Sequence, residues 1–299
     1  MNKKPRPNRA ITLFFVFICV AIVFAGIWGI VSGFAKLMHY GENTTIQQDP
    51  AALAPEPPQE TETTEPPMEE EVLEKNTYSA DGFYEIDGIR FYHGGDYEGV
   101  AGIDVSAYQT EIDWEKVKSS GVEFAMIRVG YRGYTTGNLD LDDCFHAHIK
   151  GALEAGLDVG VYFFSQSLTP EEAVEEAEYV VEQIKEYEIS YPVVYDWEEV
   201  QGPARTDEMN MLMLTSCAMA FCETIEKAGY EAGVYFNQTY GYEQFNLVSL
   251  KDYVFWLAEY DPVPSFVYNF QIWQYTNEGT VPGIEGPVDL NICFRKRTA

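Results

Sequence analysis

The feature that most constrains the fold is an alternation of apolar, strand-like runs with amphipathic segments from Val100 onward. The strand-like runs are VAGIDVS, FAMIRVGY, DVGVYFFS, PVVYDWE, EAGVYF, YVFWLAEY, FQIWQYT and PVDLNIC. Strands that alternate with helices predict a mainly parallel sheet, and about two hundred residues of this pattern favour a β/α barrel. The last strands follow one another without long helices, so we expect the barrel to be irregular there.

Three long amphipathic segments are predicted to be helices, namely DDCFHAHIKGALEAG, TPEEAVEEAEYVVEQIKEY and RTDEMNMLMLTSCAMAFCETIEKAG. The first and third end at Gly156 and Gly229, as helices often do. The second opens with Thr169, Pro170 and Glu172, which together form a capping box with proline in the first turn.

A β-hairpin is predicted ahead of the barrel, in FYEIDGIRFY, because Asp87 and Gly88 suit the positive φ angles of a type I′ turn. This turn sets three pairs opposite each other: Ile86 and Ile89, Tyr84 and Phe91, and Glu85 and Arg90. We place the hairpin at residues 77–98 and the barrel at residues 99–299.

Residues 11–35 are uncharged and long enough, at about 1.5 Å per residue, to cross a bilayer core of about 30 Å. We predict a transmembrane helix there, which binds the lipid bilayer. The basic residues of the tail at 1–10 favour a cytoplasmic N-terminus and place the bulk of the chain outside the cell membrane. Cleavage of this segment as a signal peptide near SGFA, which would give a secreted form, is the alternative.

Residues 36–76 are rich in Pro, Glu and Thr and poor in aromatic residues, so they predict a disordered acidic linker. The whole chain carries a formal net charge of -29, which makes nucleic acid an unfavourable partner.

The cysteines outside residues 11–35 are Cys144, Cys217, Cys222 and Cys293. Their spacings match neither a metal knuckle nor a redox motif. We expect free, mostly buried thiols, although a disulfide between Cys144 and Cys293 stays open at this point.

In the stretch YPVVYDWEEV, an apolar strand is followed directly by three acidic residues, Asp196, Glu198 and Glu199. Because side chains alternate along a strand, Val194, Asp196 and Glu198 should share one face. Glycoside cleavage uses two such carboxylates, one to donate a proton to the leaving oxygen and one to stabilise charge at the sugar. Other strand tips also carry acids, which argues for a shared pocket at the barrel rim: Asp104, Glu259 and Asp289.

The motifs GIDVSAYQ, IRVGYRG, AGLDVGVYFFS, PVVYDWE, GVYFN, FWLAEY, WQYT and VDLN, in this order, resemble those of the glycoside hydrolase family 25 lysozymes. The resemblance covers about residues 100 to 295 and implies a flattened β/α barrel that cleaves the β-1,4 bond between N-acetylmuramic acid and N-acetylglucosamine in peptidoglycan. It implies that Glu198 is the general acid, Asp196 its partner and Asp104 a carboxylate on the same floor. It also implies that the substrate is held by Asp289, Tyr162, Tyr260, Trp256 and Gln274.

Two roles for Asp196 stay open, because it could attack the sugar directly or orient the 2-acetamido group of the substrate. The resemblance favours the second role and net retention. Two other classes of function are weighed: a wall-binding barrel without catalysis, and a metal-dependent carbohydrate hydrolase that uses the acids as oxygen ligands. The four histidines offer little for a zinc site, so no metal or other cofactor is expected.

Overall fold

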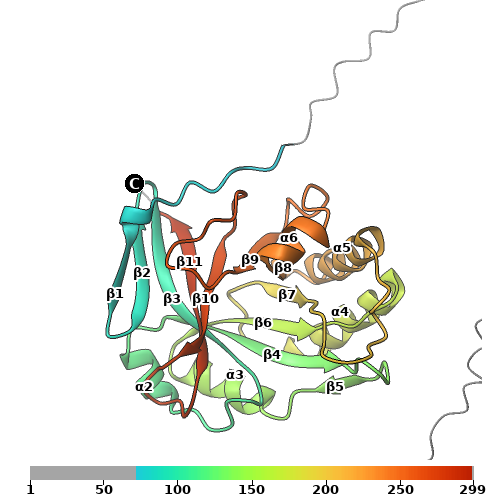
Figure 1. Cartoon of the computed structure of the whole chain (residues 1–299). Helices are drawn as coiled ribbons and strands as arrows, with labels where there is room; N and C mark the ends of the chain where they lie inside the picture. The colour runs from blue at the N-terminus through green and yellow to red at the C-terminus, as the bar shows by residue number, and fades with distance from the viewer. Residues whose placement is uncertain (1–71, 298–299) are drawn as a thin grey trace, which may run out of the picture. The chain divides into compact units, whose positions relative to one another are not determined.

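The computed structural model describes residues 72–297 (Figure 1). The predicted basic tail, the transmembrane segment at 11–35 and the linker up to residue 71 lie outside this range. Among the residues it does describe, no helix is both long and apolar enough to cross a membrane.

Strands close into an irregular barrel in the order β3-β11-β10-β9-β8-β7-β6-β4, and β4 pairs back onto β3. Their bounds are Tyr97–Val105 (β3), Phe124–Arg132 (β4), Asp158–Phe164 (β6), Val193–Asp196 (β7), Ala232–Asn237 (β8), Val254–Ala258 (β9), Ile272–Gly279 (β10) and Val288–Lys296 (β11). Neighbouring strands are parallel except for β11, which is antiparallel to both β10 and β3. The mainly parallel sheet and its irregular end are therefore confirmed.

The helices are α2 (Trp114–Ser119), α3 (Phe145–Glu154), α4 (Pro170–Ile184), α5 (Met211–Lys227) and α6 (Gln238–Glu243). The three long predicted helices are α3, α4 and α5, but α5 begins at Met211 because Asn210 caps it by accepting a hydrogen bond from the Met213 amide. In α4, Thr169 accepts from the Glu172 amide, while the Glu172 carboxylate reaches past the cap to the amide of Leu168.

The hairpin consists of β1 (Phe83–Ile86) and β2 (Ile89–Gly94), and its three predicted pairs are confirmed. It lies on the opposite side of the barrel from α4 and α5 (Figure 1). Because β2 also pairs with the start of β3, hairpin and barrel form one continuous sheet. Residues 74–76, at the end of the predicted linker, hydrogen-bond to the barrel through Val267 and Asn269. A short strand that the sequence did not reveal, β5 (Leu139–Leu141), pairs with β4.

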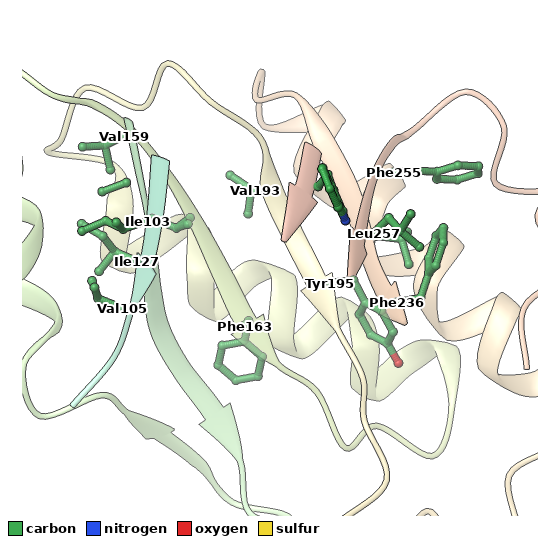
Figure 2. Packing of buried hydrophobic residues seen from close by; sticks show 14 of the residues in the cluster. Ile103, Val105, Ile127, Val159, Phe163, Val193, Tyr195, Phe236, Phe255 and Leu257 are labelled. Atoms are coloured by element: carbon green, nitrogen blue, oxygen red, sulfur yellow. The ribbon is translucent and has the colours of Figure 1, made fainter. Parts of the chain in front are cut away.

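The core has two layers, because alternate residues of each strand face the helices or the barrel interior. Val193 and Tyr195 of β7 belong to the layer under the helices, together with Ile127 and Leu257 (Figure 2). The interior layer is a smaller apolar cluster that includes Phe124, Met126, Val194, Trp256 and Ile272. Gly102 makes room for it, since a Cβ there would lie 2.3 Å from the Phe124 ring.

All four cysteines of the described part of the chain are free, as expected, so Cys144 and Cys293 do not form a disulfide. Cys217 and Cys222 are fully buried, whereas Cys144 and Cys293 are half-buried.

Candidate active site

Above the interior apolar cluster the barrel opens into a cavity of about 740 Å³. The structure brings all eight site residues expected from the sequence to its lining: Asp104, Tyr162, Asp196, Glu198, Trp256, Tyr260, Gln274 and Asp289. Parallel strands end at this rim, whereas antiparallel β11 begins there. This is why Asp289, the second residue of β11, stands opposite Asp104 near the end of β3.

Asp196 is the last residue of β7 and is only 5% exposed. Burial raises its pKa well above the ordinary value of 3.8, and the charges of Glu198 and Asp104 raise it further. Its Oδ1 atom accepts no hydrogen bond from any residue between 72 and 297. This oxygen is itself buried, so the absence of a donor adds to the cost of the charged form of Asp196.

Glu198 follows the strand by two residues and is half-buried at the cavity wall. Burial and the charge of Asp289 raise its pKa, so its carboxyl group retains a proton above the ordinary value of 4.5. Its backbone is fixed by the fully buried Gln166, whose Nε2 donates to the Glu198 carbonyl oxygen at 3.0 Å. The Gln166 Oε1 atom in turn accepts from the Thr206 hydroxyl at 2.8 Å.

Asp104 and Asp289 form a second acidic pair. The side-chain amides of Asn291 and Gln274 donate to Oδ2 of Asp104, at 2.8 and 2.9 Å. Burial and the Asp289 charge nevertheless raise the pKa of Asp104 well above its ordinary value, and a hydrogen bond between the two carboxyl groups adds to this. Burial raises the pKa of Asp289 as well, so both carboxyl groups of the pair favour the protonated form more than an exposed aspartate does.

Aromatic residues orient these amides. The hydroxyls of Tyr260 and Tyr235 donate to Gln274 Oε1 at 2.8 and 3.1 Å, and the Trp256 indole donates to Asn291 at 2.8 Å. Trp256 is only 1% exposed, so it supports Asn291 rather than offering a face to a ligand. Tyr260 is 52% exposed and does present its ring to the cavity.

Sequence reasoning missed Asn291, Tyr235 and Gln166. Asn291 lies two residues after Asp289 in VDLN, so strand alternation could have placed it on the same face. Tyr235 could have been found in GVYFN by the same rule. Gln166 lies beyond the end of β6 and carries no comparable signal.

The expectation that Glu259 would join the strand-tip acids was wrong. Its carboxylate accepts from the Ser265 amide at 2.8 Å, the Ser265 hydroxyl at 2.6 Å and the Phe266 amide at 3.2 Å. These donors turn Glu259 away from the cavity, where it anchors the loop between β9 and β10.

Between residues 72 and 297, no three or more His, Cys, Asp or Glu side chains are grouped so that they could hold a metal ion.

A closed β/α barrel with paired acids of raised pKa at its mouth defines the class of barrel glycoside hydrolases. Residues 103–284, more than half of the 299-residue chain, match the sequence model described as Glycosyl hydrolases family 25. The chain belongs to this family.

Two curated relatives are lysozymes. Lysozyme M1 of Streptomyces globisporus is 29% identical over 209 residues, which cover 66% of this chain and 68% of the relative. The autolytic lysozyme of Clostridium acetobutylicum is 27% identical over 191 residues, or 64% of this chain and 54% of the relative.

Solved structures agree with this assignment. The modular autolysin LytC from Streptococcus pneumoniae, in complex with a synthetic peptidoglycan ligand, gives a TM-score of 0.60 at 26% identity, covering 72% of this chain and 52% of LytC. A family 25 glycosyl hydrolase from Bacillus anthracis gives 0.54 at 25% identity, covering 68% of this chain and 92% of that chain. This chain thus spans about half the length of LytC and of the clostridial relative.

Proposed function

We propose that the protein is a muramidase that hydrolyses the β-1,4 bond between N-acetylmuramic acid and N-acetylglucosamine in peptidoglycan strands. The observation that carries this proposal is the placement of Glu198 and Asp196, both with raised pKa, on the wall of one open cavity. Membership of family 25 and the likeness to lysozymes support it.

Glu198 acts as the general acid. Its raised pKa favours the protonated carboxyl group above the ordinary value of 4.5, and its side chain lines the cavity in which the glycosidic oxygen would lie. Gln166 fixes the backbone at this point, which limits the positions that the Glu198 carboxyl group can take. Donation of the proton lets the sugar oxygen leave as a neutral hydroxyl.

Asp196 stabilises the reacting sugar by orienting its 2-acetamido group, so that the acetamido oxygen attacks the anomeric carbon. The place of Asp196 on the cavity wall supports this role, because a carboxyl oxygen there can accept the hydrogen bond of the acetamido N–H. Water then opens the resulting ring intermediate, and the product retains its configuration. Direct attack by Asp196 also retains it, so a first-formed product of inverted configuration would rule out both routes.

The test is digestion of purified peptidoglycan, followed by mass spectrometry of the new reducing ends. N-acetylmuramic acid at those ends is the expected result, and N-acetylglucosamine ends would contradict the proposed bond. Glu198→Gln should abolish the release of new reducing ends. The matched control is Glu199→Gln, which changes the exposed neighbouring residue and should leave the release unchanged. Binding to the wall without new ends would instead identify a wall-binding protein, and loss of activity in EDTA a metal-dependent enzyme.

Residues 11–35 anchor the enzyme in the cell membrane, with the N-terminus in the cytoplasm and the barrel outside. The uncharged length of this segment and the basic residues before it support this arrangement. Extraction of membranes with alkaline carbonate should leave the full-length chain in the pellet. A shortened chain in the culture medium, starting after residue 35, would show cleavage as a signal peptide.

A further inference from the structure

Part of the cavity lining consists of tyrosines and an arginine, which have no role in the proposed acid catalysis. Three partly or largely exposed tyrosines belong to this part, Tyr108, Tyr131 and Tyr134, with exposures of 85%, 37% and 47%. The guanidinium of Arg128 lies between two of them, 5.5 Å from the Tyr108 ring centroid and 5.7 Å from that of Tyr131. We call Arg128, Tyr108 and Tyr131 the arginine platform.

Arg128 is held in place but keeps free donors. Its Nε and Nη2 atoms bind Oδ2 of Asp142 at 2.8 and 2.7 Å, while Nη1 forms no hydrogen bond within residues 72–297. Asp142 is fully buried and also accepts from the amides of Ala107 and Cys144, so its charge is shared with the backbone. The guanidinium side chain is 17% exposed, which leaves it reachable from the cavity.

The second arginine of the cavity lining cannot serve the same purpose. Arg132 donates to the carboxylate of Glu176 at 2.7 Å and to the carbonyls of Gly137 and Glu172 at 2.9 and 2.8 Å. Its side chain is 5% exposed. Arg128 is therefore the cation of this lining with donors left for an anion, in a cavity otherwise surrounded by carboxylates.

The position of the platform fits a substituent of the sugar that lies at the acids. Arg128 of β4 pairs in register with Tyr162 of β6, which pairs with Val194 of β7, two residues before Asp196. With strands about 4.8 Å apart and about 3.3 Å per residue along a strand, the platform lies about 10 to 12 Å from Asp196 along the sheet. This is the scale of one sugar with its side group.

We propose that the arginine platform binds a carboxylate carried by the muramyl substituent of the glycan and thereby selects carboxylate-bearing strands over neutral ones. This inference rests on the proposed muramidase function. Guanidinium N–H groups match a carboxylate geometrically, and the two flanking rings hold the guanidinium between them. The carboxylate could be the lactyl group of a peptide-free muramic residue or a carboxylate of the stem peptide.

The test compares kcat/KM on two matched substrates: peptide-free glycan strands, and the same strands with their lactyl carboxylates converted to methylamides. The wild-type protein should prefer the carboxylate strands by about tenfold or more, as expected for a charged hydrogen bond. Intact peptidoglycan separates the two sources, because its lactyl groups are amide-bound and only stem carboxylates remain. If removal of the Arg128 charge lowers the rate on peptide-free strands but not on intact strands, the platform binds the lactyl carboxylate. If it lowers the rate on intact strands alone, the platform binds a carboxylate of the stem peptide.

Two variants test the platform, one that keeps the buried pair matched and one that removes only the counter-charge. The double variant Arg128→Gln/Asp142→Asn keeps a neutral hydrogen-bonding pair and should lower the preference to about one. Asp142→Asn alone removes the counter-charge and should raise the preference above that of the wild-type protein. Tyr84→Ala, which removes an exposed tyrosine of the hairpin, is the matched control and should leave the preference unchanged.

The inference would be overturned, while cleavage itself stands, if the double variant kept the wild-type preference for carboxylate strands. It would also be overturned if the wild-type preference were one and the double variant kept the wild-type rate on intact peptidoglycan. Failure of the muramidase proposal looks different, because the wild-type protein would then cleave neither substrate. NMR titration with N-acetylmuramic acid and its methylamide measures the same preference without turnover. Equal affinity for the two ligands would reject the lactyl carboxylate as the group that the platform binds.

Discussion

Two of the regions in which the protein buries carboxylates differ in their surroundings. At the loop between β9 and β10, Glu259 is surrounded by hydrogen-bond donors from Ser265 and Phe266. At the cavity, Asp196 has an oxygen without a partner, and the Glu198 carboxylate accepts no hydrogen bond from the described part of the chain. Both regions remove carboxyl groups from water. Only the loop around Glu259 offsets the lost hydration of its carboxylate with several hydrogen-bond donors.

The difference teaches what each region can do. A buried carboxylate with several donors stays fixed and holds the backbone that provides them. A buried carboxylate with few donors keeps its proton, because burial penalises the charged form. The cavity acids therefore reduce the stability of the fold but have the protonation states that acid catalysis needs.

The largest expected effect comes from the cavity. Glu198→Gln should lower kcat on peptidoglycan by about 10² to 10⁴-fold, because the amide cannot donate a proton to the leaving oxygen. The melting temperature should stay the same or rise, since burial already disfavours the Glu198 charge. Release of reducing ends and thermal unfolding measure the two effects on the same sample.

The exposed Glu199→Gln variant is the control for both measurements. It should keep the activity and the melting temperature of the wild-type protein. If Glu199→Gln lost the activity and Glu198→Gln kept it, Glu199 rather than Glu198 would be the general acid.

Asp196→Asn should lower kcat by about 10² to 10³-fold, as the loss of one preorganised electrostatic partner does. The free energy of unfolding at neutral pH should not fall, because the variant removes a buried group with an unpartnered oxygen. Denaturant unfolding and kcat measured side by side check this, with the exposed Asp140→Asn as control.

The role of Asp196 can be separated further with N-deacetylated glycan, which lacks the acetamido group. If Asp196 orients that group, Asp196→Asn should cause little additional loss on this substrate, because both changes remove the same step. Full additivity of the two losses would favour direct attack by Asp196 instead.

The sequence predicted the cavity floor because one rule governs it. Alternation along β7 put Val194 and Asp196 on one face, and the shared rim of parallel strands brought in Asp104. Asp289 follows the same rule only because β11 is antiparallel, so that the start of this strand lies at the rim. The chain order of the strands could not show that reversal.

The fate of Glu259 could not be predicted by this rule. β9 ends at Ala258, so strand alternation no longer fixes the direction of the Glu259 side chain. That direction depends on Ser265 and Phe266, whose amides reach back across a loop without a recognisable motif. The start of α5 was missed for a similar reason, because the cap at Asn210 competes with several polar residues before it.

Glu259→Gln should lower the free energy of unfolding by about 2 to 3 kcal/mol, because the new amide group would face the Phe266 N–H and leave that donor unpaired. The pH dependence of kcat should not change, since Glu259 does not line the cavity. Denaturant unfolding measures the loss, and the exposed Glu278→Gln should change stability by less than about 0.5 kcal/mol. If Glu259→Gln left the free energy of unfolding unchanged, the hydrogen bonds to Glu259 would not stabilise the loop, and the two regions would not differ in this respect.

The smallest expected effect is the pH dependence of stability. The pKa values of Asp104, Asp196, Glu198 and Asp289 are raised in the folded protein. Above their ordinary values of 3.8 and 4.5, the folded state therefore binds more protons than the unfolded state. The free energy of unfolding should therefore rise as the pH falls towards these ordinary values, by at most about 1.4 kcal/mol per pH unit for each proton that only the folded state binds.

Glu172 behaves in the opposite way, because hydrogen bonds from Leu168 and Arg205 lower its pKa despite partial burial. Its contribution is present above the ordinary value of 4.5 and is lost as the pH falls below that value, so stability should pass through a maximum in mildly acidic solution. Asp104→Asn/Asp196→Asn should flatten this rise. The exposed pair Glu199→Gln/Glu278→Gln makes the same change in formal net charge and should leave the rise intact. Equal slopes in the two double variants would assign the pH dependence to the overall charge of -29 rather than to the cavity.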